Sequence, residues 1–140
     1  MLLVNVAVRN RGNMQLNTHT NIDNTLCGKV IKLEVDYAEV LLHTTRQMTA
    51  DKQGLVHGGF VFGAADYAAM SAVNDPYVVL GSSSSKFIAP VKVGDVVLCK
   101  AKVVSEKGKK KLVTVQAFVS DKTIYEGEFT TFVLDKHVLG

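Results

Sequence analysis

The chain has 140 residues, of which 47% are hydrophobic and 21% charged, a balance that is typical of one globular domain. A formal net charge of +3 is too small to indicate a nucleic-acid partner, and no apolar run approaches the roughly 18 residues that span a membrane. The two cysteines, Cys27 and Cys99, lie outside any CxxC pair and fit buried, reduced thiols. Because the chain also starts without a secretory-signal pattern, we expect a cytoplasmic protein.

Residues 1–24 are rich in Asn and Thr and show no clear periodicity. They predict an irregular lead-in to a single domain over residues 25–140. Strands are predicted over residues 29–36 and 37–45. In the first strand apolar side chains alternate with charged ones and are expected on one face, namely Ile31, Leu33 and Val35.

Residues 56–74 predict a long helix that is apolar nearly all the way round and therefore buried. The helix starts at His-Gly-Gly, contains one charge, Asp66, and is ended by Asn74-Asp75-Pro76. A carboxylate inside a buried helix must be paired, hydrogen-bonded or shifted toward its neutral form. Asp66 is therefore the leading candidate for chemistry.

Further strands are predicted after the helix, over residues 77–89, 96–104, 112–120 and 123–134, with a hairpin turn around residues 106–110. Two strands, one helix and about four antiparallel strands make an α+β protein. A helix that is apolar on all sides fits a curved antiparallel β-sheet wrapped around it better than an open sheet.

The glycines at the helix start are the second candidate feature. Gly58 and Gly59 leave backbone N–H groups uncovered at the positive end of the helix, which suits an anion or a developing oxyanion, although glycine there also permits close packing. Gly59 and Asp66 lie on nearly the same helix face but about 10 Å apart along the axis. If both act on one carbonyl, they must come from two antiparallel helices of a dimer.

Several other side chains have a structural or a functional interpretation. His57 caps the helix or holds the preceding loop, or else it orients a substrate. Ser82 and Ser84 are small residues where strand and helix approach closely, or hydroxyls that orient water. Phe62 offers apolar lining for a pocket, and Lys86 and the lysines near the hairpin tip are candidates for ligand phosphates. His19, His43 and His137 show no metal-ligand spacing, and no cofactor is expected.

These motifs resemble hotdog-fold acyl-CoA thioesterases, in particular the phenylacetate-pathway type. That pattern has Gly, two residues, His-Gly-Gly and an Asp nine positions after the His, which here are Gly54, His57-Gly58-Gly59 and Asp66. A strand ending in aromatic-x-x-Pro and a Gly-Asp pair follow at residues 87–90 and 94–95, and the resemblance covers about residues 25–135. The chain departs from the pattern at Asp51, where the family often has Asn, and at Leu80, where some relatives have a polar residue.

The resemblance implies a hotdog fold in dimers that often pair into tetramers, with the Gly59 amide on a thioester carbonyl and Asp66 of the partner subunit as base or nucleophile. We therefore predict hydrolysis of acyl-CoA to free acid and CoA. The predicted catalytic residues are Asp66, Gly59 and His57, and the predicted substrate-binding residues are Gly58, Phe62, Ser82, Ser84 and Lys86.

Two rival functions use the same fold. A non-catalytic acyl-CoA-binding module or sensor would not need a buried carboxylate. A dehydratase would need a catalytic His with a carboxylate partner, and no such pattern is clear.

Overall fold

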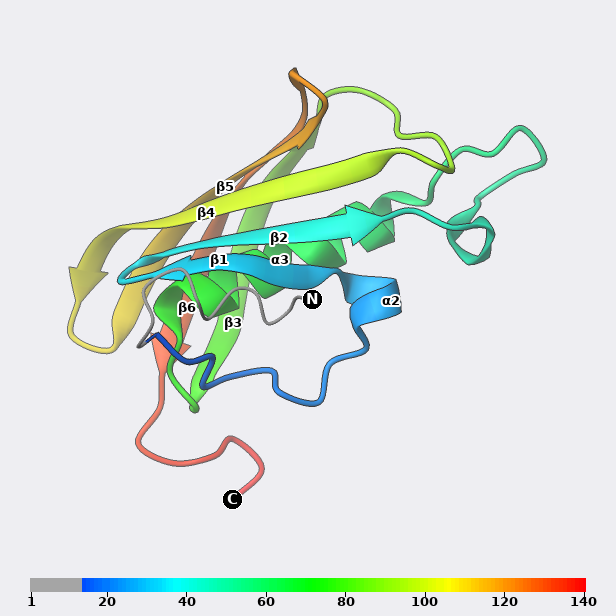
Figure 1. Cartoon of the computed structure of the whole chain (residues 1–140). Coiled ribbons are helices and arrows are strands. Elements are labelled where there is room, and N and C mark those ends of the chain that lie inside the picture. Colours follow the sequence, from blue (N-terminus) through cyan, green and yellow to red (C-terminus); the bar gives the residue numbers. More distant parts are fainter. Residues whose placement is uncertain (1–13) are drawn as a thin grey trace.

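One long helix lies inside a curved, six-stranded sheet in the computed structural model, which describes residues 14–140 (Figure 1). In chain order the elements are α2 (Asn24–Cys27), β1 (Lys29–Glu34), β2 (Tyr37–His43), the 3-10 turn η1 (Arg46–Met48), α3 (Gly58–Val73), β3 (Val78–Phe87), β4 (Val96–Lys107), β5 (Lys110–Val119) and β6 (Lys122–Val133). Every predicted strand is present, with ends shifted by a few residues. The predicted helix is α3, and it ends at Val73, directly before Asn74.

All neighbouring strands are antiparallel, and their order across the sheet is β1-β2-β4-β5-β6-β3. The sheet bends around α3, with β1 and β2 on one side of the helix and β3 and β6 on the other (Figure 1). α3 packs chiefly against β2 and β4, and much less against β6 and β3. The α+β architecture of one long helix wrapped by a curved antiparallel sheet is therefore confirmed, but the helix lies off-centre.

The side chains of β1 do not simply alternate between the two faces of the sheet. The pairing of β1 with β2 is irregular between Val30 and Lys32, and the buried side chains are Val30 and Leu33. The expectation that Ile31 and Val35 share a face with Leu33 is wrong. A bulge adds a residue and reverses the alternation, and Val35 is 78% exposed in the turn to β2.

A second bulge lies in β3 and controls which serines face the helix. Leu80 pairs with Thr131, and Ser83 pairs with Phe129. Three steps along β3 therefore match two steps along β6, and the extra residue lies at Gly81. Thr131 and Phe129 are buried toward α3. Ser83 and Ser85 therefore share the helix side of the sheet, and Ser82 and Ser84 share the outer side.

The described part of the predicted lead-in, residues 14–23, contains no helix or strand and is attached to the end of α3. The side chain of Asn74, which ends the helix in a left-handed conformation, accepts a hydrogen bond from the Asn17 N–H at 2.7 Å and donates one to the Gln15 carbonyl at 2.8 Å. The His19 ring stacks on Tyr67 of α3 with a centroid distance of 6.0 Å. Residues 1–13 lie outside the described residues, and no helix in the described part is long and apolar enough to cross a membrane.

Candidate active site

One face of α3 is left uncovered along the first half of the helix. Gly59, Phe62, Gly63 and Asp66 stand at offsets of zero, three, four and seven and therefore share this face. Gly59 is exposed, the other three are half-buried, and a Cβ added at Gly63 would meet nothing within 4 Å. From Ala64 onward the sheet covers the other faces of α3, and the expected burial holds there. It does not hold on the uncovered face.

Asp66 has the electrostatic character expected of a reactive carboxylate. Its Oδ1 atom is buried and has no hydrogen-bond partner within the described residues. Burial disfavours the charged form and raises the pKa of this carboxyl from 3.8 to about 6. A buried acceptor without a donor destabilises a fold, so its presence is better explained by a functional role than by stability.

The start of α3 presents backbone N–H groups without an acceptor, near the helix face that carries Asp66. Neither the Gly58 nor the Gly59 backbone N–H has an acceptor within the described residues, since the first N–H groups of a helix have no partner one turn back. A Cβ at Gly58 would lie 3.3 Å from the Phe87 ring, so this glycine also permits β3 to pack closely against the helix. At Gly59 the three atoms nearest to an added Cβ all belong to the His57 ring, the nearest at 3.0 Å.

His57 precedes the first helical residue, but its side chain makes no capping hydrogen bond. Its backbone N–H donates to the Met48 carbonyl at 2.8 Å, so this hydrogen bond joins the helix start to the last residue of η1. The ring is exposed and meets Phe60 edge-on with a centroid distance of 6.1 Å. Of the three roles that the sequence analysis considered for His57, side-chain capping has no support in the structure.

An apolar cavity of about 290 Å³ opens at the helix start. Its lining is entirely uncharged and comes from the loop before α3, the first turn of α3, the end of β3 with the segment after it, and β6: Leu55, Val56, Gly58, Val61, Phe87, Ile88, Ala89, Pro90, Val91 and Ile124. The sequence analysis did not predict this cavity. The aromatic-x-x-Pro motif at residues 87–90, which the sequence analysis did identify, forms part of its wall. The cavity can hold an apolar group next to the free amides.

The other predicted binding residues do not all meet at this point. Phe62 is on the uncovered face, with its ring 5.5 Å from that of Phe129. Ser84 and Lys86 line a separate, polar groove on the outer side of the sheet, and Ser82 shares that side. The serine hydroxyls on the helix side are instead those of Ser83 and Ser85, and the Ser85 hydroxyl lies 2.6 Å from the Tyr125 hydroxyl.

The lysine-rich hairpin tip lies at the opposite end of the sheet from the helix start. Lys110 pairs with Phe132, and Phe132 pairs with Val79 near the beginning of β3, whereas Phe87 at the end of β3 contacts Gly58. At about 3.3 Å per residue the separation along β3 is roughly 26 Å. Within one chain, these lysines therefore cannot reach a group bound at Gly59.

Asp66 should make folding stability depend on pH in a defined direction. The unfolded carboxyl releases its proton near 3.8 and the folded one near 6, so between these values the folded chain binds more protons. The free energy of unfolding should therefore fall as the pH rises through this window and level off above it. Chemical denaturation at a series of pH values should show this fall in the wild type but not in Asp66→Asn. The exposed turn variant Asp121→Asn is the matched control and should follow the wild type.

The chain belongs to the Thioesterase superfamily, whose sequence profile matches residues 53–126. This segment runs from the loop before α3 into β6 and includes the whole helix start and Asp66. The solved structure of an uncharacterized protein from Pyrococcus horikoshii superimposes with a TM-score of 0.90 and 49% identity, covering 91% of this chain and 98% of that one. A mutant of the phenylacetic acid degradation protein PaaI from Thermus thermophilus superimposes with a TM-score of 0.72 and 26% identity, covering 78% and 95%. The hotdog thioesterase fold expected from the sequence is thereby confirmed.

Two curated relatives have different names. A methylthioribose-1-phosphate isomerase of Aquifex aeolicus is 54% identical over 123 residues, which are 87% of this chain but 27% of that protein. A transcription factor FapR of Thermoanaerobacter is 31% identical over 113 residues, which are 80% of this chain and 56% of that protein. The chain thus spans between about a quarter and just over half the length of these relatives, and their names describe longer proteins.

Proposed function

We propose that this protein hydrolyses acyl-CoA thioesters to a free acid and CoA, in sites shared between two copies of the chain. The observation that carries the proposal is Asp66: a buried, unpartnered carboxylate on the uncovered face of α3, with its pKa raised to about 6. Membership of the Thioesterase superfamily supports the reaction class. The free amides and the apolar cavity at the helix start support binding of a carbonyl attached to an apolar group.

In the proposed reaction the Gly59 N–H donates to the thioester carbonyl and stabilises the oxyanion that forms during attack. Asp66 of the partner subunit takes a proton from the attacking water, or attacks the carbonyl itself. When water attacks, the carbon–oxygen bond forms, the carbon–sulfur bond breaks, and the proton taken by Asp66 passes to the departing CoA thiolate. When Asp66 attacks, the carbon–sulfur bond breaks to leave a mixed anhydride with the acyl group, and water then hydrolyses this anhydride to the free acid and supplies the proton for the thiolate. The raised pKa makes Asp66 a stronger base than an ordinary surface carboxylate.

The shape of the protomer supports a site shared between two copies. β3 is an edge strand of ten residues, and its residues 81–84 are exposed. Because α3 lies mainly over β2 and β4, the helix side of the sheet beside β3 has room for a second helix. An unpaired edge of this length favours pairing with another strand. Two copies joined at β3 would bring their uncovered α3 faces together, with Gly59 of one near Asp66 of the other.

The pH dependence of the reaction should follow the ionisation of Asp66. Only the deprotonated carboxylate can act as base or nucleophile, so kcat/KM should rise with pH through a value of about 6 and level off above it. Initial rates with one acyl-CoA over a pH series would measure this. Asp121→Asn should give the wild-type profile, and a rate that is independent of pH across this range would contradict a role for Asp66 as base.

A non-catalytic acyl-CoA sensor is the second candidate, and the similarity to a transcription factor favours it. Release of free thiol and binding should both be measured for short, long and aromatic acyl-CoAs. Turnover with at least one acyl group supports the enzyme. Tight binding of acyl-CoA with no thiol release above the uncatalysed rate would support the sensor.

A further inference from the structure

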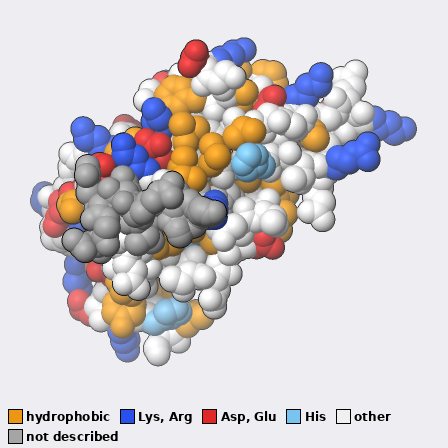
Figure 2. All heavy atoms as spheres, in the orientation of Figure 1, with side chains coloured by type: hydrophobic (Ala, Val, Ile, Leu, Met, Phe, Trp, Pro, Cys, Tyr) orange, Lys and Arg blue, Asp and Glu red, His pale blue; other side chains and the backbone are white. Residues whose placement is uncertain are grey.

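The groove on the outer side of the sheet has a charged lining and does not suit an apolar ligand. It measures about 680 Å³, and Lys100 and Glu126 line it on either side of β5, in one row through Gln116. Figure 2 shows the surface in the orientation of Figure 1, with Lys and Arg side chains at both ends of the view and hydrophobic side chains between them. An apolar group bound in this groove would take lysines and glutamates out of water without pairing them, which is unfavourable.

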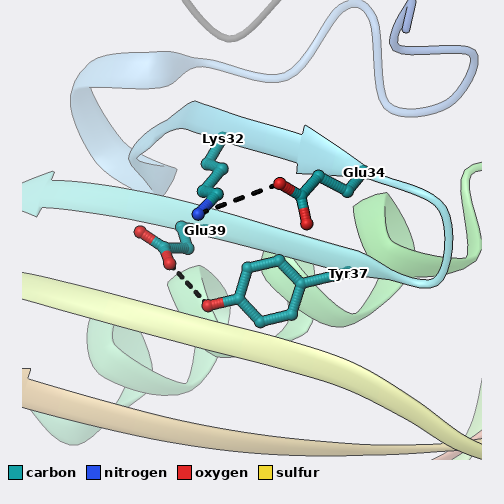
Figure 3. Close-up of polar contacts among 4 residues, drawn as sticks. All are labelled: Lys32, Glu34, Tyr37 and Glu39. Carbon is teal, nitrogen blue, oxygen red and sulfur yellow. Dashed lines mark hydrogen bonds and ion pairs between the residues drawn. The ribbon is translucent and has the colours of Figure 1, made fainter. Parts of the chain in front are cut away.

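Polar contacts continue on the same outer side across β1 and β2. The Tyr37 hydroxyl donates a hydrogen bond to Glu39, and Lys32 forms an ion pair with Glu34 (Figure 3). These four side chains are half-buried, and none of them is apolar enough to line a site for a hydrocarbon chain. The outer side of the sheet is therefore a poor place for the acyl group of the proposed substrate.

The cavity at the start of α3 has the opposite character, because no charged residue lines it. Its inner wall consists of four buried side chains that are all β-branched: Val56, Val61, Val91 and Ile124. Exposed apolar side chains surround its mouth, namely Leu55, Phe87 and Ile88. Gly58 also lines the cavity, and the free N–H of the next residue, Gly59, is the proposed donor to the thioester carbonyl. A carbonyl bound there would place its acyl group at the mouth of this cavity.

Backbone hydrogen bonds fix the walls of the cavity relative to one another. The Val56 N–H donates to the Val91 carbonyl at 2.8 Å, which ties the loop before α3 to the segment after β3. The Ile88 N–H donates to the Ile124 carbonyl at 2.9 Å, which ties the mouth to β6. Because β-branched side chains also have few rotamers, the inner wall cannot easily move aside for a longer ligand.

The volume of the cavity limits the size of the acyl group. One methylene group fills roughly the 30 Å³ that a water molecule occupies in the liquid, so a cavity of about 290 Å³ holds at most about nine carbon atoms. The lining also offers no charged partner to an acyl group that ends in a carboxylate, and burial of an unpaired carboxylate is unfavourable.

We propose that this cavity binds the acyl group and restricts the substrates to uncharged acyl groups with at most about nine carbon atoms beyond the carbonyl. The inference rests on the proposed function, because it takes acyl-CoA to be the ligand. Octanoyl and phenylacetyl groups are within this limit, whereas a hexadecanoyl group is well beyond it.

A series of acyl-CoAs, each below its micelle concentration, tests the size and charge limits. From butyryl-CoA to octanoyl-CoA, kcat/KM should rise about fourfold with each added methylene, and it should rise no further for dodecanoyl-CoA and hexadecanoyl-CoA. Phenylacetyl-CoA should be a substrate. Succinyl-CoA has the chain length of butyryl-CoA but ends in a carboxylate, and its kcat/KM should be lower by about tenfold or more. A higher kcat/KM for hexadecanoyl-CoA than for octanoyl-CoA would contradict the size limit.

Two variants should move the size limit in opposite directions. Val61→Phe fills part of the cavity and should lower kcat/KM for octanoyl-CoA relative to butyryl-CoA by about tenfold or more. Val91→Ala enlarges the cavity and should raise kcat/KM for dodecanoyl-CoA relative to octanoyl-CoA. Val78→Ala makes the same change at a buried position at the other end of β3 and should keep the wild-type profile. Thermal unfolding checks the fold, and either folded cavity variant suffices as a test. An unchanged chain-length profile in a folded variant would show that the cavity does not bind the acyl group.

Binding measurements separate this inference from the proposed hydrolysis. Isothermal titration of Asp66→Asn with the same acyl-CoAs gives dissociation constants without turnover. Affinity that rises up to octanoyl-CoA and then stops rising supports the pocket, even if the wild type hydrolyses no acyl-CoA. If neither the dissociation constant nor kcat/KM depends on chain length, the pocket assignment is wrong, and any hydrolysis observed in the wild type still stands.

Discussion

Asp66→Asn should reduce thioester hydrolysis by about 10²-fold or more while acyl-CoA binding and the fold persist. The amide has nearly the shape of the carboxylate but can neither accept a proton from water nor attack a carbonyl. Because Oδ1 of Asp66 has no hydrogen-bond partner within the described residues, the substitution breaks no contact there. Initial rates and isothermal titration with the same acyl-CoA would measure the two effects separately.

The exposed turn variant Asp121→Asn provides the matched control, since it makes the same chemical change away from α3 and should retain full activity. Circular dichroism and thermal unfolding should show both variants folded. Turnover of Asp66→Asn close to the wild-type rate would remove this residue from catalysis and favour the acyl-CoA sensor instead.

Mixing two inactive variants should restore activity if each site takes Gly59 from one copy and Asp66 from the other. Gly59→Pro removes the amide N–H that is proposed to bind the carbonyl, and proline is tolerated in the first turn of a helix. In a mixed dimer with Asp66→Asn, one site is doubly impaired and the other has both functional groups intact. Random assortment of equal amounts should therefore give about a quarter of the wild-type activity.

The experiment requires that the subunits exchange, which partial denaturation and refolding of the mixture achieves. Each variant refolded alone is the control and should stay inactive. The added proline ring must displace the exposed His57 ring, so the fold of Gly59→Pro should be checked by thermal unfolding. An inactive mixture of folded, exchanged subunits would show that Gly59 and Asp66 do not act across two copies.

The architecture could be predicted from local patterns because those patterns report burial. An apolar segment of helical length, bounded by His-Gly-Gly and Asn-Asp-Pro, can only be a helix inside the protein, and α3 runs from Gly58 to Val73 as expected. Alternation in the remaining segments predicted the strands. The resemblance carried by His-Gly-Gly and Asp66 also implied the reaction class, and the superfamily match agrees with it.

The serine run shows what local patterns cannot determine. Counting by twos from Val78 places Ser82 and Ser84 on the helix side, but the bulge at Gly81 reverses the alternation and puts Ser83 and Ser85 there. A bulge depends on pairing with β6, a strand more than forty residues away in the sequence, so no window around the serines contains this information.

The chain sequence by itself determined one long buried helix, a mostly antiparallel sheet and a single buried carboxylate, because side-chain polarity and backbone preference act over a few residues. Only the tertiary structure decided which face of α3 stays uncovered, since that depends on the helix lying over β2 and β4 rather than over β3. It also decided that Lys100 and Glu126 stand on either side of β5 in one row of the outer face. These relations arise from strand order and register, which join residues that are far apart in the chain.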